Sequence, residues 1–574
     1  MKVLKLIAYL VMFLIKEILD FKIYINNLFI LIKKLRKPYE YFFKNEKLEI
    51  FSDKNLNSYI QLNSKIWENN TSSYTKIKKK VLIESLINHP QYLITNCIIG
   101  ARLAIFYNLD CVGMIREGDL ISEKIMKSFG IKEIIKIGYG NFFSRLCYFL
   151  KGIKILGLDK KTRDLINFKI DNIEIGKTAY ESYVRYKKRN LTKKVNFTLF
   201  YFLSKILYSN YLINKILDKK KYVYLVQAEK QFVPFRIFFQ NALKRKMIIY
   251  TRYGSGGNIA VRRYNNFNNV NSHRAGISKK IVKFYYTNFK KEILSNFKNN
   301  FRNVLINNIG SEVYQNLNIN KNLLKNINNK EEICKLFGWK IEDPIVLIFS
   351  HLLVDGNFVN KWNLFNSNQE WLEETLKVIN KTKNVNWIIK PHPSEEIYEA
   401  KINAKDIFNK IIDHKNNIKF FPTNFSIKNF YKFIDIIITS HGTVGYQYPQ
   451  LGKTTIICGD TYYSGHGFNV EPKTQKKYFH LLRNIQKIKP IKKSQMEKSI
   501  VFSYAFNVVT KVKIPTIYNS DITMNYDEQK FWRESYKLLK KYTNKKNEKN
   551  FYKSLDFQFL NNNENLINLS KSNF

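Results

Sequence analysis

The stretch Asp435-Ile-Ile-Ile-Thr-Ser-His-Gly-Thr-Val-Gly445 decides how this chain folds. Its first half is an apolar, β-branched run that stops abruptly at small and polar residues. A buried parallel strand has this pattern when it delivers a loop to the edge of an α/β sheet. The stretch Trp387-Ile-Ile-Lys-Pro-His-Pro-Ser-Glu395 repeats the pattern earlier in the chain. Together they predict an α/β domain in the carboxyl-terminal part of the protein.

The loops that follow these two strands carry residues suited to an anion. Loops beyond the carboxyl ends of parallel strands are where open α/β sheets bind ligands. Each loop contains a histidine, His392 or His441. The second loop also presents Ser440, Gly442 and Thr443 where a helix should begin. Because backbone N–H groups at a helix start favour a phosphate, we expect this domain to bind a nucleotide.

Strand and helix patterns alternate through most of the 574 residues. Tyr222–Val226 and Met247–Tyr250 are predicted strands with a helix at Pro234–Leu243 between them, which makes a βαβ unit. The alternation resumes from Pro344 to Cys458. A chain of this length is too long for one core. We therefore predict an α/β fold with two Rossmann-like domains facing across a cleft.

Shifts in composition set the predicted domain boundaries. Residues 1–80 are expected to form an amino-terminal helical extension, residues 81–320 an acceptor-side domain, and residues 321–525 the nucleotide-binding domain. The Asn- and Lys-rich segment Asn316 to Lys330 is the predicted linker. Residues 526–574 are expected to hold a terminal helix and a disordered tail of low complexity.

The chain is strongly basic, with 96 Lys and Arg residues against 46 Asp and Glu residues and a net charge of +50. Such a charge attracts polyanions, either anionic lipid headgroups or nucleic acid. A nucleic-acid-binding protein would gather basic residues on one element with interleaved aromatics, whereas here they are scattered. The charge favours an anionic membrane surface as partner, with a solvated basic surface as the alternative, and no nucleic acid is expected.

The amino terminus is apolar from Val3 to Ile15 apart from Lys5, and a basic cluster follows from Lys33 to Lys37. The run is shorter than the ~20 residues that a spanning helix needs. The pattern is compatible with an amphipathic helix on a membrane surface and with a plain helix packed on the protein. Five cysteines without a C-x-x-C pair are typical of reduced thiols. The predicted location is cytoplasmic, peripheral on the inner face of the cytoplasmic membrane.

The order of motifs resembles bacterial surface-polysaccharide glycosyltransferases of the GT-B fold, especially the capsule-type enzymes that use CMP-Kdo. Those enzymes carry Lys-Pro-His-Pro, then a Ser/Thr-Gly-Thr helix start, then Gly-Lys-Pro. Polymerases that use CDP-glycerol and bacterial sialyltransferases are similar at these points. The resemblance covers about residues 90 to 490. The matching residues are Lys390-Pro391-His392-Pro393, Ser440-His441-Gly442-Thr443 and Gly452-Lys453, with further matches at Ile173 to Tyr180, Arg185 and Asp460 to Tyr463.

The sequence departs from that pattern at three positions. Gln447 stands where these families usually carry a Glu that holds a ribose hydroxyl. Pro449 is expected to break the helix after Gly442 early, and Thr454 stands where a proline is usual. These departures leave the donor base and sugar open.

The resemblance implies a glycosyltransferase that passes a sugar from a nucleotide-activated donor to a growing capsule or lipopolysaccharide. Its partners would be the nucleotide-sugar, which is a substrate and not a cofactor, and a polysaccharide or lipid-linked acceptor. A CDP-glycerol-type phosphotransferase and a non-hydrolysing nucleotide-sugar 2-epimerase are alternatives within the fold. A basic nucleic-acid-binding protein is the alternative from another class.

The predicted site has two catalytic groups. His392 is placed to hydrogen-bond the leaving phosphate, and Glu229, which follows the strand Tyr222–Val226, is the candidate general base, with Asp119 and Glu117 as rivals. No Asp-x-Asp pair follows a strand, so we expect no metal.

The remaining candidates surround the predicted phosphate. Charge on the leaving nucleotide would be met by the helix start at Gly442, by His392 and by Lys390 or Lys453. Gln447 is expected at the ribose. His351, Arg252, Tyr463 and His466 are further candidates, whereas His89, His273, His414 and His480 are expected to be ordinary surface or core residues.

Overall fold

The chain divides into two compact units. The first unit comprises Met1–Tyr183, Thr192–Val270 and Val509–Phe574, and the second comprises Val184–Leu191 and Asn271–Val508. The computed structural model describes residues 5–19, 54–68, 79–87, 89–138, 140–157, 161–188, 195–254, 258–308, 329–356, 361–392, 395, 401–412, 417–422, 427–518, 527–544 and 550–571.

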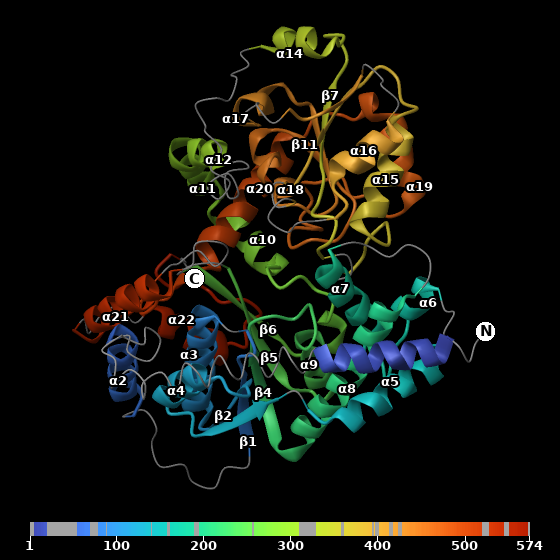
Figure 1. Cartoon of the computed structure of the whole chain (residues 1–574). Helices are drawn as coiled ribbons and strands as arrows, with labels where there is room; N and C mark the ends of the chain where they lie inside the picture. The colour runs from blue at the N-terminus through green and yellow to red at the C-terminus, as the bar shows by residue number, and fades with distance from the viewer. Residues whose placement is uncertain are drawn as a thin grey trace, which may run out of the picture. The chain divides into compact units, whose positions relative to one another are not determined.

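The first unit is built on a seven-stranded sheet with the strand order β12-β6-β5-β4-β1-β2-β3 (Figure 1). The strands from β1 to β5 pair in parallel, while β6 is antiparallel to β5 and β12 is antiparallel to β6. The strands are β1 (Lys79–Glu84), β2 (Asp110–Arg116), β3 (Glu133–Ile137), β4 (Lys221–Gln227), β5 (Ile248–Tyr253), β6 (Asn258–Tyr264) and β12 (Val512–Lys513).

Helices cover both faces of this sheet. On one face α2, α3, α4, α21 and α22 share an apolar core with Val81 and Ile83 of β1. On the other face α8 and α9 pack against β4 and β5. The helices are residues 5–19, α2 (Lys54–Glu68), α3 (Pro90–Tyr107), α4 (Leu120–Ser128), α5 (Phe142–Leu156), α6 (Thr162–Ile166), α7 (Ile175–Lys187), α8 (Phe197–Lys219), α9 (Phe235–Lys244), η1 (Phe267–Asn269), α21 (Glu528–Asn544) and α22 (Asn550–Leu560).

Local sequence explains the ends of α3, the helix that follows β1. The ring of His89 accepts a hydrogen bond from the backbone N–H of Gln91, so it caps the first turn. Pro90 occupies the first helical position, where its missing N–H costs nothing. Asn108 ends the helix in the left-handed conformation at φ 52°. His89 and Pro90 therefore fix the β1–α3 turn, and Asn108 ends the helix before β2.

The second unit is built on a five-stranded parallel sheet with the order β11-β10-β7-β8-β9. Its strands are β7 (Ile345–Phe349), β8 (Asn386–Lys390), β9 (Ile418–Phe420), β10 (Ile436–Thr439) and β11 (Thr454–Ile457). Its helices are α10 (Lys279–Asn288), α11 (Lys290–Asn296), η2 (Phe297–Phe301), α12 (Arg302–Asn308), α14 (Lys330–Phe337), α15 (Asn368–Ile379), α16 (Ala404–Ile411), α17 (Ile427–Phe430), η4 (Tyr431–Phe433), α18 (Val444–Gln447), η5 (Pro449–Leu451), α19 (Gln475–Arg483), η6 (Ile485–Lys487), α20 (Lys493–Tyr504) and η7 (Ala505–Val509).

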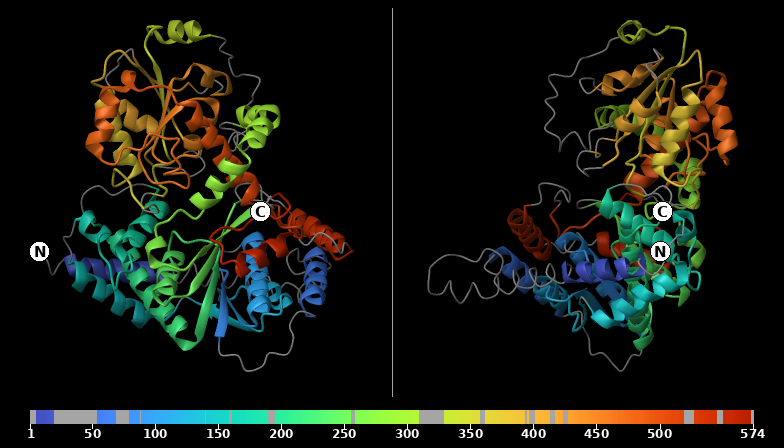
Figure 2. Two further views of the ribbon diagram at one scale, coloured as in Figure 1. Left: turned by 180° about the vertical axis from the view of Figure 1, so that it is seen from behind. Right: turned by 45° about the vertical axis from the view of Figure 1, so that its right-hand side comes forward.

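Both faces of the second sheet are buried, which explains its unbroken apolar strands. Trp387 and Ile389 of β8 point into a core shared with α15, α16 and α19. Ile388, between them, points into a second core with α14 and α17. Figure 2 shows these helices on either side of the strands. The α/β class and the two Rossmann-like units are therefore as predicted.

Several predicted domain boundaries need correction. Residues 1–80 are not a separate extension, because β1 begins at Lys79 and is central to the first sheet, and α2 packs against α21. The carboxyl-terminal tail is not disordered in residues 550–571. There Phe551, Leu555 and Phe559 recur at helical spacing in α22 and are buried in the first core. The chain from 509 onward thus returns to the first unit instead of ending outside both.

The second unit begins earlier than residue 321, since residues 271–308 belong to it. The predicted linker around Asn316 and the basic cluster from Lys33 to Lys37 lie outside the described residues. Among the helices that the structure describes, none is long and apolar enough to cross a membrane.

Candidate functional site

Each sheet reverses its direction of growth once, and the candidate residues lie at these two points. In the first unit the chain builds β1, β2 and β3 in one direction, then places β4 on the other side of β1. In the second unit it builds β7, β8 and β9, then places β10 on the other side of β7. The crevice beyond the carboxyl ends of such strand pairs is where open α/β sheets bind ligands.

In the second unit a histidine stands two residues beyond each of three neighbouring strands. His351 follows β7, His392 follows β8 and His441 follows β10. Phe349 pairs with both Lys390 and Thr439, so the strand register places the three histidines in one row. The ring centroids of His351 and His441 are 3.9 Å apart, and those of His351 and His392 are 5.9 Å apart. The structure thus joins three separate sequence candidates, which we call the histidine row.

Burial keeps the histidine row neutral at pH 7. It lowers the pKa of His392 to about 3, with the nearby His351 and Lys390 adding to the shift. It also lowers the pKa of His351 and brings the pKa of His441 well below its ordinary value. The three rings can therefore act as hydrogen-bond donors and acceptors but not as cations.

A hydrogen-bond network fixes the proton on His441. The hydroxyl of Ser440 donates to Asn368 Oδ1 at 3.2 Å, and Ser440 Oγ lies 3.1 Å from His441 Nδ1. Since that hydroxyl has only one hydrogen, His441 Nδ1 must donate. The buried His441 Nε2 is then an acceptor, and it has no partner among the described residues. A ligand hydroxyl, such as one on a ribose or sugar, would donate the missing hydrogen bond to this nitrogen.

Two side chains from later in the sequence hold the loop after His441 in place through its backbone carbonyls. The hydroxyl of Tyr463 donates to the carbonyl of Gly442, and Asn469 Nδ2 donates to the carbonyl of Gly445 at 2.6 Å. A Cβ on Gly445 would overlap the Tyr463 hydroxyl. Tyr463, a predicted contact residue, is fully buried and supports the loop instead.

The helix that begins in this loop is short. α18 ends at Gln447, as expected from Pro449, and the chain continues in η5. Thr443 is its N-cap residue but makes no side-chain cap hydrogen bond. Ser440, His441 and Gly442 lie directly beyond β10, so the predicted phosphate loop does reach the sheet edge.

The two predicted lysines lie at opposite edges of the sheet. Lys390 ends β8, is buried, and holds its Nζ 5.1 Å from the ring centroid of Phe421. Lys453 precedes β11, and its Nζ donates to the carbonyl of Lys432, which lies before β10. Because parallel strands start at one edge and end at the other, Lys453 lies away from the histidine row. The prediction that it meets the phosphate is wrong.

Two further histidines, His466 and His273, lie in other segments of the second unit. His466 packs against Phe502, with ring centroids 4.8 Å apart, and burial lowers its pKa to about 4. His273, expected to be ordinary, is close enough for its charge to lower the pKa of His441, and its ring centroid lies 5.1 Å from that of Tyr462. His273 thus lies within electrostatic range of His441.

The first unit carries a buried carboxyl group that the sequence did not single out. Glu84 is the last residue of β1 and is fully buried. The backbone N–H groups of Leu86 and Ala228 hydrogen-bond to it, while its Oε2 finds no partner in the described part of the chain. Burial raises the pKa of Glu84 to about 7, and the charge of Glu229 adds to this. A carboxyl with such a pKa suits proton transfer at neutral pH.

The predicted base Glu229 lies beyond the neighbouring β4. Its Oε1 accepts hydrogen bonds from the backbone N–H groups of Lys230 and Gln231, at 2.7 and 3.1 Å. Its carboxylate thus also caps the loop that contains it. The rival Asp119 caps α4 in the same way, by accepting from the N–H of Ser122.

Further polar groups are buried at this edge of the first sheet. Arg252 belongs to β5, and its guanidinium lies 4.4 Å from the ring centroid of Tyr92. Buried polar atoms almost always have partners, so atoms without one point to a bound water or ligand. Within the described residues, those atoms are Ser85 Oγ, Gln227 Oε1, Thr251 Oγ1 and both amide atoms of Gln91.

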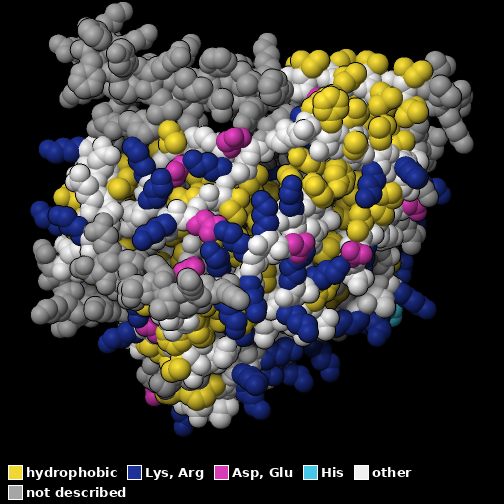
Figure 3. All heavy atoms as spheres, turned by 90° about the horizontal axis from the view of Figure 1, so that it is seen from below, with side chains coloured by type: hydrophobic (Ala, Val, Ile, Leu, Met, Phe, Trp, Pro, Cys, Tyr) yellow, Lys and Arg dark blue, Asp and Glu magenta, His cyan; other side chains and the backbone are white. Residues whose placement is uncertain are grey.

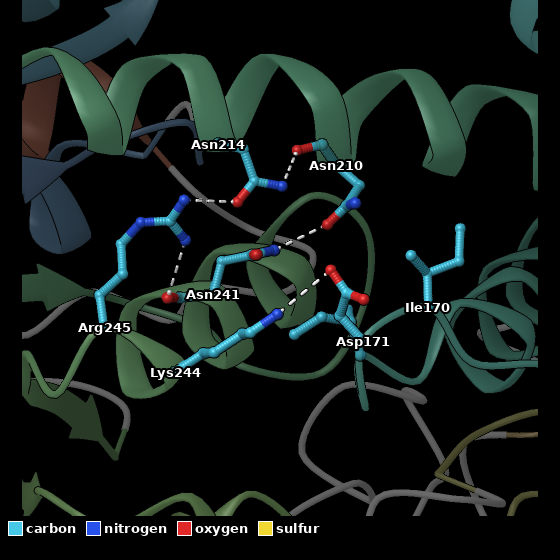
Figure 4. A pocket seen from close by; sticks show the side chains of 8 residues that line it. Ile170, Asp171, Asn210, Asn214, Asn241, Lys244 and Arg245 are labelled. Carbon is cyan, nitrogen blue, oxygen red and sulfur yellow. Dashed lines mark hydrogen bonds and ion pairs between the residues drawn. The ribbon is translucent and has the colours of Figure 1, made fainter.

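A separate polar cavity of about 340 Å³ lies between α8, the end of α9 and the loop before α7 (Figure 4). Its amides bond to one another: Asn241 Nδ2 donates to Asn210 Oδ1, and Arg245 donates to Asn214 Oδ1. The end of α9 leads into the start of β5, so this cavity is at the amino-terminal edge of the sheet. It is therefore not part of the candidate site.

No protein-family model matches the chain, and no curated protein matches it. Among solved structures, the Thermosulfurimonas dismutans KpsC, beta Kdo 2,7 transferase, is similar with a TM-score of 0.28 and 13% identity, covering 58% of this chain and 89% of that one. The UDP-GlcNAc 2-epimerase from Neisseria meningitidis is similar with a TM-score of 0.21 and 10% identity, covering 81% and 98%. Similarity at this level supports no conclusion about function.

Proposed function

We propose that this protein is a glycosyltransferase that moves a sugar from a nucleotide-activated donor to a hydroxyl of a cell-surface polysaccharide or lipid-linked acceptor. The observation that carries the proposal is the histidine row, three partly buried and neutral imidazoles at the point where the second sheet changes direction. The row includes the histidines of the Lys-Pro-His-Pro and Ser-His-Gly-Thr motifs, on which the resemblance to GT-B enzymes rests.

The donor would bind along the carboxyl edge of the second sheet. A neutral His392 can donate an N–H to a phosphate oxygen, and the buried Lys390 adds positive charge nearby. His441 Nε2, as an acceptor, suits a ribose or sugar hydroxyl. These groups are preorganised by burial and by the Ser440 network, so they can stabilise a leaving nucleotide without reorganising during the reaction.

The acceptor would bind at the edge of the first sheet, where a proton acceptor is available. Glu84, or Glu229 beside it, would take the proton of the acceptor hydroxyl as that oxygen bonds to the anomeric carbon. The bond from the anomeric carbon to the phosphate oxygen breaks, and the nucleotide leaves with the electron pair. With a pKa of about 7, Glu84 is half deprotonated at neutral pH and matches this task better than an ordinary carboxylate.

The direct test is to incubate the purified chain with CMP-, CDP-, UDP- and GDP-activated donors, with and without oligosaccharide acceptors, and to follow nucleotide release and product mass. Transfer should occur with one nucleotide class and disappear in His392→Ala. An acceptor-independent change of the sugar's stereochemistry would identify a 2-epimerase. Transfer of glycerol phosphate would identify a phosphotransferase. Either result would replace the proposal.

A further inference from the structure

The helix of residues 5–19 exposes apolar side chains where an ordinary surface helix exposes polar ones. Such a helix normally buries apolar side chains and exposes polar ones. Here the exposed residues are all apolar: Ile7, Ala8, Val11, Met12, Leu14, Ile15, Ile18 and Leu19. The one acidic residue, Glu17, is buried. The apolar face is therefore turned toward the surroundings.

Specific contacts hold the helix in this orientation. Phe13 stacks on Phe149 of α5, with ring centroids 4.4 Å apart. Glu17 is 2% exposed, and its carboxylate accepts hydrogen bonds from Arg145 Nε at 2.7 Å and from the hydroxyl of Tyr201 at 2.8 Å. A buried ion pair with two satisfied oxygens strongly disfavours rotation of the helix, because rotation would leave both charges unpaired. The outward apolar face is thus fixed by the fold.

The exposed apolar surface is large, and basic side chains border it. Ile15 is 53% exposed and Ile18 is 67% exposed, and on the neighbouring α5 Phe143 is 73% exposed. Figure 3 shows hydrophobic side chains gathered at the upper right, with Lys and Arg side chains beside them. Apart from the buried Glu17, the helix and α5 contain no carboxylate, and they carry Lys5, Lys16, Lys151 and Lys154.

We infer that this surface, the outward face of residues 5–19 together with Phe143, docks the protein onto an anionic lipid bilayer. The helix lies flat, with its apolar side chains at the level of the headgroups and the upper acyl chains. The exposed Lys151 and Lys154 of α5 then reach the lipid phosphates, while their stems cover apolar surface.

Charge argues against a second copy of the chain as the occupant. A symmetric pair formed by this face would bring together the exposed Lys151 and Lys154 of both copies, and neither copy has an exposed carboxylate on the described part of these helices. An anionic bilayer offers both an apolar layer and a negative surface. This inference does not depend on the proposed reaction.

The test is flotation of the full chain with vesicles of phosphatidylcholine alone or mixed equally with phosphatidylglycerol. The wild-type chain should float with the anionic vesicles and only weakly with the neutral ones. The double variant Ile15→Glu/Ile18→Glu should bind at least about tenfold more weakly, because two apolar side chains no longer insert and negative charge is added. Leu560→Glu is the matched control: Leu560 is 70% exposed on α22, and its replacement should leave flotation unchanged.

Three results would overturn the inference. One is equal flotation of the wild type and the double variant, and another is equal loss in the Leu560→Glu control. The third is a change of oligomeric state in the double variant, measured by analytical ultracentrifugation, which would show that a second copy covers this face. A milder pair, Ile15→Ser/Ile18→Ser, should also weaken flotation, and it separates loss of insertion from any folding defect seen in a thermal melt.

Discussion

The carboxyl edges of the two sheets have the same topology but opposite chemistry. In the first unit the position where the strand order reverses holds Glu84, whose pKa is raised to about 7. In the second unit the same position holds the histidine row, in which the pKa of His392 is lowered to about 3. Burial is the main cause in both cases, because a low dielectric disfavours whichever form is charged. One architecture thus supplies a proton acceptor in one unit and neutral hydrogen-bonding rings in the other.

The largest effect should come from His392→Ala. Loss of the N–H that meets the leaving phosphate should lower kcat by about 10²–10⁴-fold and weaken nucleotide binding, while the fold stays intact. His480→Ala, at an exposed histidine of α19, is the control and should behave as wild type. Steady-state kinetics with a circular dichroism check would decide this, and normal turnover of His392→Ala would remove that residue from the mechanism.

Replacing the carboxyl of the other edge should affect the chemical step alone. Glu84→Gln should lower kcat by about 10²–10³-fold with little change in donor affinity, because a general base acts in the transition state. The wild-type rate should fall as pH drops below about 7, and the variant should lack that limb. If Glu229→Gln has the larger effect and removes the limb, Glu229 is the base and Glu84 only positions its loop.

The two edges should respond to pH in opposite directions. The pKa of Glu84 in the folded protein is about 7, above its unfolded value of 4.5, so folding favours the protonated carboxyl. This contribution to the free energy of unfolding is lost as pH rises from 4.5 through about 7. The folded pKa of His392 is below 6.5, so its contribution is lost as pH falls from 6.5 towards about 3.

Each of these pH effects is on the order of a few kcal/mol. Denaturant unfolding of Glu84→Gln and His392→Asn at several pH values would measure them. Glu84→Gln should gain stability relative to wild type above pH 7, and His392→Asn should gain it at low pH. Parallel pH curves for wild type and either variant would contradict the assigned pKa direction.

A chelator should have only a small effect. The groups proposed to meet the leaving phosphate are His392, Lys390 and the backbone N–H groups beyond β10, so activity in excess EDTA should stay within about twofold of the untreated enzyme. Loss of activity that magnesium or manganese restores would show that a divalent ion does this work instead.

The smallest effect should come from Lys453→Ala. Its side chain lies at the amino-terminal edge of the second sheet and bonds to a backbone carbonyl there. Turnover and nucleotide affinity should therefore remain within about twofold of wild type, since this partly buried side chain lies at the edge opposite the histidine row. A tenfold loss of nucleotide affinity would show that the site extends to the wrong edge of the sheet.

Four of the five strands of the second unit were predictable from sequence to within about a residue, because runs such as Ile436–Thr439 are buried on both faces. The short β9 (Ile418–Phe420) was missed. β1 was missed because its Lys79-Lys80 start continues a polar stretch, and Glu84 was missed with it. α22 was missed because Asn and Lys residues mask the spacing of its buried Phe551 and Leu555.

The site was predictable in its parts but not in its assembly. Each histidine of the row could be recognised because it follows a strand, but only the pairing of Phe349 with Lys390 and Thr439 brings the three together. The error at Lys453 was avoidable in principle, since a residue that precedes a parallel strand lies at the edge opposite its loops. The burial that lowers the histidine pKa values depends on the whole fold and has no local signal.

The central claim is that the carboxyl edge of the second sheet binds the nucleotide, and calorimetric titration with CMP, CDP, UDP and GDP tests it most directly. The wild-type chain should bind one of these nucleotides, His441→Ala should bind it at least about tenfold more weakly because an acceptor for a ribose hydroxyl is lost, and Lys453→Ala should bind it as wild type does. Equal affinity for the wild type and His441→Ala, or a loss confined to Lys453→Ala, would contradict the account.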